Sequence, residues 1–134
     1  MKKTHDDYYS DLEFFEDKAG WRGNDRVTIR THETIHCNAA FSKRAKLNKE
    51  TLVRLGYSPK RKEIIFDFTE DPKAPGAYSL VQSGKTSFTI ACRSFFRAYN
   101  FNMNEIAGRY IPRKERIPKI GECWLIKLDE KVEK

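Results

Sequence analysis

The chain has 134 residues, of which 39% are hydrophobic and 13% aromatic, enough to bury a core without disulfides and too many rings for a disordered chain. No apolar run approaches the roughly 18 residues that a membrane helix needs, so we expect no membrane contact. Lys and Arg outnumber Asp and Glu by 26 to 19, and the resulting net charge of +7 indicates an acidic partner.

Residues 25–70 predict the order strand, strand, short helix, strand, strand. Val27 and Ile29 alternate with polar residues, which is typical of a half-buried strand over 26–30. A second strand is predicted at 34–38, after which the apolar spacing becomes helical with Asn38 as the N-cap. Two further alternating runs, joined by a turn that contains Pro59, predict a hairpin over 51–57 and 62–68.

Residues 76–129 predict the same order of elements again. The expected elements are strands at 77–81 and 86–90, a helix at 92–99, and strands at 108–113 and 122–128. A shift of 53 residues lays Ile35 on Phe88 and Cys37 on Ile90, while a shift of 54 lays Phe41 on Phe95. The sequence therefore predicts an internal repeat, with two unrelated halves as the alternative.

The segment from Thr34 to Ala45 places a short apolar strand, a helix-opening residue and a basic helix one after another, and the hairpin 52–68 follows. This order resembles the AbrB/SpoVT/MazE swapped-hairpin group. The resemblance implies a mainly β, α+β fold with two short helices. Its two ββαββ units, at 25–70 and 76–129, would close one pseudo-symmetric, eight-stranded swapped-hairpin (cradle-loop) barrel, as in tandem-unit members such as MraZ.

The chain departs from that group at two points. Asn38 stands where the group commonly has Pro, and the Asp-x-x-x-Arg signature of the tandem-unit members is absent. The chain is also similar to small uncharacterised proteins of phages and prophages, which imply no activity. A similar barrel is therefore better supported than a shared function.

The positive charge is concentrated in two blocks, one in each predicted unit. Residues 26–62 carry 10 basic and 2 acidic residues, and residues 84–121 carry 8 and 2. If the units are related by a pseudo-twofold axis, both blocks converge on one face that grips the phosphates of double-stranded DNA, as a transcriptional regulator would. The predicted DNA-binding residues are Arg26, Arg30, Lys43, Arg44, Lys46, Arg93, Arg97 and Arg113, within a wider basic set that includes Lys85. An ordinary solvated surface is the alternative interpretation.

Two other functions remain open at this stage. The first is a phage-encoded interaction protein that uses the barrel to bind a host protein, as a monomer or a homodimer. His32-Glu33-Thr34-Ile35-His36 matches the zinc-peptidase motif His-Glu-x-x-His, in which a helix brings both imidazoles to one metal. The surrounding β-branched residues favour a strand, where the two histidines would lie roughly 13 Å apart at about 3.3 Å per residue. We therefore predict no metal, no cofactor and no catalytic residue.

Two features bear on the compartment and on the start of the chain. Cys37, Cys92 and Cys123 form no Cys-x-x-Cys pair, so we expect reduced, buried thiols. The chain turns acidic after Lys3, where a signal peptide is apolar, which predicts a cytoplasmic protein. Residues 1–24 are expected to form an acidic, aromatic N-terminal arm.

Overall fold

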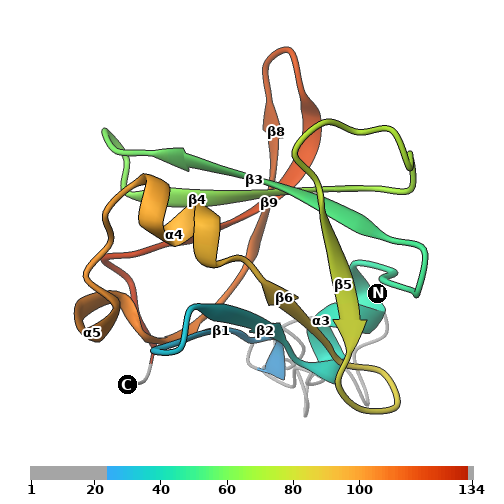
Figure 1. The fold of residues 1–134 in the computed structure, drawn as a ribbon, viewed down its shortest axis with the longest axis horizontal. Coiled ribbons are helices and arrows are strands. Elements are labelled where there is room, and N and C mark those ends of the chain that lie inside the picture. Colours follow the sequence, from blue (N-terminus) through green and yellow to red (C-terminus); the bar gives the residue numbers. More distant parts are fainter. Residues whose placement is uncertain (1–23, 133–134) are drawn as a thin grey trace, which may run out of the picture.

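A computed structural model describes residues 24–132 and contains one antiparallel sheet of nine strands with three short helices (Figure 1). Strands make up 42% of the described residues, which confirms the mainly β class. No helix in this part of the chain is long and apolar enough to cross a membrane. The predicted arm, apart from Asn24, lies outside the described residues.

The first five elements follow the predicted order. They are β1 (Val27–Arg30), β2 (Thr34–Cys37), α3 (Ala39–Arg44), β3 (Leu52–Ser58) and β4 (Glu63–Thr69). Asn38 is the N-cap of α3, as predicted, and its side-chain oxygen accepts a hydrogen bond of 2.9 Å from the backbone N–H of Phe41. Lys43 and Arg44 occupy the last turn, where cations complement the helix dipole.

The second half contains one helix and one strand more than predicted. Its elements are β5 (Tyr78–Gln82), β6 (Phe88–Ala91), α4 (Arg93–Ala98), α5 (Met103–Ile106), β7 (Gly108–Tyr110), β8 (Arg113–Ile117) and β9 (Gly121–Lys127). The single strand expected over 108–113 is interrupted after Tyr110, because Pro112 has no N–H to donate to a ladder. Residues 24–132 therefore form nine separate strands and three helices, where the sequence predicts eight strands and two helices.

The strands are interlaced between the two halves of the chain. The order in the sheet is β7-β1-β2-β6-β5-β3-β4-β9-β8, so the β1–β2 hairpin lies between β7 and β6, and the β3–β4 hairpin lies between β5 and β9. The strands at the two ends of this order, β7 and β8, are consecutive in the chain, which means that the sheet curls (Figure 1). The sheet therefore pairs strands that lie far apart in the sequence.

The largest fully buried side chains are those of Tyr110, Phe41, Phe66, Phe96, Ile29, Ile35, Ile64, Ile90 and Ile126.

The β1–β2 and β5–β6 hairpins have the same pairing register. Each residue of the first hairpin lies 53 residues before its counterpart in the second, and β2 pairs with β6 in a register centred on His36 opposite Thr89. The His36 Nδ1 atom lies 3.1 Å from Thr89 Oγ1. The corresponding pairs are Val27↔Cys37 and Ile29↔Ile35 in one hairpin, and Leu80↔Ile90 and Gln82↔Phe88 in the other.

The C-terminal ends of α3 and α4 also share one geometry. The backbone N–H of Leu47 donates to Ser42 O at 2.9 Å, and the N–H of Phe101 donates to Phe96 O at 3.1 Å. The residue before each donor has a left-handed backbone, with φ of 60° at Lys46 and 58° at Asn100. Each atom of this arrangement recurs 54 residues later, so the two helices end in the same way against the sheet.

Candidate nucleic-acid interface

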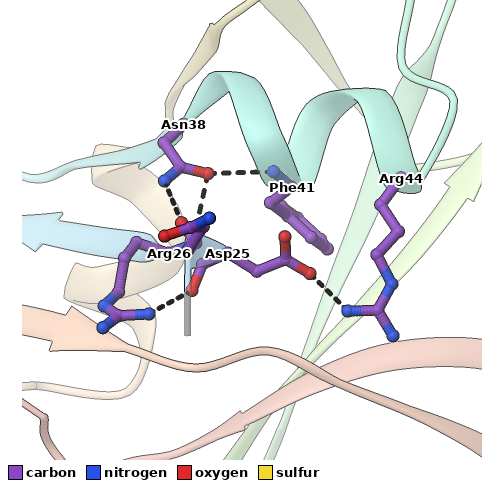
Figure 2. Close-up of polar contacts among 6 residues, drawn as sticks. Asp25, Arg26, Asn38, Phe41 and Arg44 are labelled. Carbon is purple, nitrogen blue, oxygen red and sulfur yellow. Dashed lines mark hydrogen bonds and ion pairs between the residues drawn. The ribbon is translucent and has the colours of Figure 1, made fainter. Parts of the chain in front are cut away.

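Arg44, at the end of α3, reaches toward Asp25 (Figure 2). Its Nη1 donates to Oδ2 of Asp25, whose side chain is only 1% exposed, and its guanidinium lies 5.4 Å from the Trp124 ring centroid. A charge-assisted hydrogen bond and a cation–π contact therefore hold this side chain. We assign Arg44 to the stability of the fold.

Arg26 lies beside this ion pair (Figure 2). Its Nη1 donates to Asp25 O at 2.8 Å, and its backbone N–H donates to Asn38 Oδ1 at 3.2 Å. The amide of Asn38 thus joins the start of β1 to the start of α3. Arg30, in β1, lies opposite Thr34 and is half-buried. Of these two predicted site residues, Arg30 is the last residue of β1 and Arg26 directly precedes the strand.

Three other predicted arginines are paired with carboxylates. Arg93 Nε lies 3.1 Å from Glu33 Oε1, and Arg97 Nε lies 3.2 Å from Glu33 Oε2. Glu33, in the β1–β2 turn, therefore receives both arginines of α4, and its side chain is only 18% exposed. Arg113 pairs with Glu130 at the other end of the described chain. Each of these arginines is paired with a carboxylate of the same chain, although the side chains of Arg93 and Arg97 are 67% exposed.

Lys43 and Lys46 differ from the arginines because they lie at an open pocket of about 440 Å³. The pocket lies between the end of α3 and the β5–β6 turn, and Lys49 and Lys85 complete its basic lining. We call this pocket the lysine groove. Its remaining lining residues are Ser42, Leu47, Asn48, Gln82, Thr86 and Phe88.

Four lysines line the lysine groove, and none of its ten lining residues is acidic. All four lysines are exposed, and none of them has a carboxylate of residues 24–132 within ion-pair distance. The carboxylate of Glu70 accepts a hydrogen bond of 2.9 Å from Nδ2 of the lining residue Asn48. Side-chain donors from Asn48 and Thr86 accompany the four ammonium groups. The arrangement is suited to a multiply charged anion.

Sequence reasoning found half of this groove. Lys43 and Lys46 are in the predicted set, and Lys85 is in the wider basic set. Lys49 is not among the predicted residues, because it follows the predicted basic helix. No local signal in the sequence places Lys49 at this pocket, because its position there depends on the approach of the β5–β6 turn to the end of α3.

The helix that the zinc-peptidase motif requires is not formed. His32 lies in the β1–β2 turn and His36 lies in β2, where it is paired with Thr89 of β6. His32 Nε2 lies 3.1 Å from Thr34 Oγ1, and Glu33 is engaged by the two arginines of α4. No group of three or more His, Cys, Asp or Glu residues suited to a metal ion is found within residues 24–132. The alternative of a metallopeptidase therefore has no structural basis in this segment.

The three cysteines are buried, as predicted. Burial raises the pKa of the Cys37 thiol to about 12, with the neighbouring Cys92 adding to the effect. The pKa of Cys92 is also raised to about 12, by burial and then by the charge of Glu33. A thiol in this state is not a nucleophile at neutral pH, because the thiolate is the reactive form.

His36 is the titratable group at the centre of the β2–β6 pairing. Burial lowers the pKa of its imidazole, and the positive charge of Arg30 lowers it further. Its Nδ1 lies near two hydroxyl groups, those of Thr89 and Ser83. The neutral imidazole is therefore the form that this position favours.

Comparison of the chain with protein families, curated proteins and solved structures finds no match.

Proposed function

We propose that this protein binds double-stranded DNA and that the lysine groove holds the phosphate backbone. The observation that supports this function is the convergence of Lys43, Lys46, Lys49 and Lys85 on one pocket, where none of them is ion-paired with a carboxylate of residues 24–132. Ammonium groups on flexible stems bind phosphates as point charges, and the release of condensed counterions from DNA supplies the affinity. A transcriptional regulator is the role that the resemblance to the AbrB-like group implies.

We also propose that the chain is built from two ββαββ units arranged as a swapped-hairpin barrel. The equal registers of the two hairpins, the β2–β6 pairing centred on His36 and Thr89, and the matching ends of α3 and α4 support this interpretation. With β7 and β8 counted as one strand bent at Pro112, eight strands close the barrel. In this arrangement each hairpin of one unit lies between strands of the other.

A DNA titration at several salt concentrations tests the function. If the four lysines neutralise about four phosphates, the logarithm of the binding constant falls against the logarithm of the salt concentration with a slope of about −3.6. The double variant Lys43→Glu/Lys85→Glu should abolish binding at moderate salt. The matched control is Lys60→Glu/Lys119→Glu, which changes the net charge equally at two exposed turns away from the groove.

Two outcomes would contradict the proposal. One is equal loss of affinity in the groove variant and in the control, which would indicate a response to net charge alone. The other is the absence of binding to duplex DNA at low salt by the unaltered protein. The second outcome would favour the alternative of a protein-interaction role.

That alternative has one observation in its favour. Tyr57, Tyr99 and Phe101 line a second pocket of about 470 Å³, and Tyr99 is 46% exposed. Aromatic side chains with a polar edge are enriched where proteins bind one another. If DNA is not bound, the test is whether a purified host protein binds this protein and loses affinity on Tyr99→Ala.

A further inference from the structure

At one equivalent position of their turns, the two halves of the molecule carry an acidic residue in one case and a neutral residue in the other. Three residues separate Arg30 from Thr34 in the β1–β2 turn. Three also separate Ser83 from Ser87 in the β5–β6 turn, where the Ser83 N–H donates to Ser87 O at 2.9 Å, so the shift of 53 residues places Glu33 and Thr86 at the same point. The matching ends of α3 and α4 likewise make Lys43 the counterpart of Arg97. Glu33 therefore lies relative to Arg97 as Thr86 lies relative to Lys43.

In each half, the turn residue and the helix residue of this comparison lie close to each other. Thr86 and Lys43 line the same pocket, the lysine groove. Glu33 and Arg97 are in direct contact, with distances of 3.2 Å from Nε to Oε2 and 3.5 Å from Nη2 to Oε1. One half thus contains an anion between the turn and the helix, and the other half contains a basic pocket at the same place.

We propose that Glu33 is an internal substitute for a phosphate group. Its carboxylate occupies, between α4 and the β1–β2 turn, the position that a DNA phosphate takes in the lysine groove. This inference rests on the proposed DNA binding for the identity of the natural anion. It assigns the phosphate a place beside Lys43 and Thr86, and it makes Glu33 the residue that restricts phosphate binding to one half of the molecule.

The chemistry of the two positions is consistent with this assignment. A guanidinium binds a carboxylate or a phosphate through paired N–H donors, so the site that Arg93 and Arg97 form would accept phosphate if Glu33 were neutral. At the equivalent position in the other half, Thr86 carries no charge, and Lys46, Lys49 and Lys85 line the lysine groove with it. A single neutral substitution should therefore convert the closed half into a second anion site.

The substitution must suit the backbone of the turn. Glu33 has a φ of 69°, in the left-handed region, where a β-branched residue such as Thr is strained. Glu33→Gln keeps the shape of the side chain, and Glu33→Asn places there a residue that tolerates this conformation. Glu122→Gln is the matched control, because it removes one carboxylate from an exposed ion pair with Lys114 at a distance from both turns.

The probe is pyrophosphate, followed by two-dimensional NMR of the backbone amides. In the unaltered protein we expect shifts near Lys43, Lys49 and Lys85 and none near Arg93 and Arg97. In both Glu33 variants we expect a second set of shifts at Arg93 and Arg97. Pyrophosphate should also restore part of the melting temperature that these variants lose, because a ligand that binds the folded state stabilises it.

The same variants are then titrated with duplex DNA. Two additional phosphate contacts should steepen the salt dependence of the Glu33 variants by about −1.8, and the control should keep the original slope. The inference is overturned if neither Glu33 variant shows new shifts at Arg93 and Arg97, or if the unaltered protein binds pyrophosphate equally in both halves. If the pyrophosphate results are as expected and no form binds duplex DNA, the inference stands and the proposed DNA function fails.

Discussion

The ion pair between Arg44 and Asp25 should have unequal effects on stability when each partner is removed. Arg44→Ala leaves a carboxylate that is 1% exposed without its cation, whereas Asp25→Asn leaves a guanidinium whose side chain is 34% exposed and can be hydrated. Breaking a buried ion pair typically costs 3–5 kcal/mol, and the partial hydration of Arg44 lowers this to about 2–3 kcal/mol for Arg44→Ala. For Asp25→Asn we expect about 1 kcal/mol.

The free energy of unfolding, measured by urea denaturation, checks this difference. Arg113→Ala serves as the control, because it removes one partner of an ion pair in which both side chains are 49% exposed and should cost less than about 1 kcal/mol. The double variant Asp25→Asn/Arg44→Met should recover part of the loss, since no unpaired charge remains. Equal effects of Arg44→Ala and Asp25→Asn would refute the reasoning, because the argument depends on their unequal burial.

Two further predictions follow from the buried titratable groups. Because burial lowers the pKa of His36, the unfolded state binds more protons once the pH falls below about 6.5, so stability should decrease as the pH falls through that value toward the lower pKa of the folded state. His36→Gln should remove this part of the pH dependence in denaturation curves measured between pH 5 and 8, and an unchanged difference between the two proteins across that range would contradict it. Iodoacetamide should label Cys37 and Cys92 at pH 8 only after denaturation, because burial raises both thiol pKa values to about 12; mass spectrometry showing prompt labelling of the folded protein would oppose this.

Local sequence signals predicted most of the individual elements. Alternation marked β1 and β2, and Asn38 marked the start of α3, because these signals act between near neighbours. Pro112 is also a local signal, and it interrupts the strand predicted over 108–113. The helix α5 is not predicted, because four residues are too few to show the apolar spacing of a helix.

The candidate site was less accessible from the sequence than the fold. Net charge identified basic blocks, but it could not separate Arg93 and Arg97, which Glu33 compensates, from Lys43 and Lys46, which remain open. That distinction depends on which turn approaches which helix. It is a property of long-range pairing, and a count of charges along the chain does not contain it.

The interlaced strand order has a consequence for how the chain is made. When residues 24–70 have left the ribosome, the β1–β2 and β3–β4 hairpins both lack the neighbours that flank them in the finished sheet, since β5, β6, β7 and β9 come later. Until then their edges are unpaired, and isolated hairpins are only marginally stable in water. The strands that complete one molecule can equally be supplied by the same strands of another copy. Folding in a crowded polysome therefore carries an inherent risk of exchanging hairpins between chains, and dilution during refolding should favour the monomer.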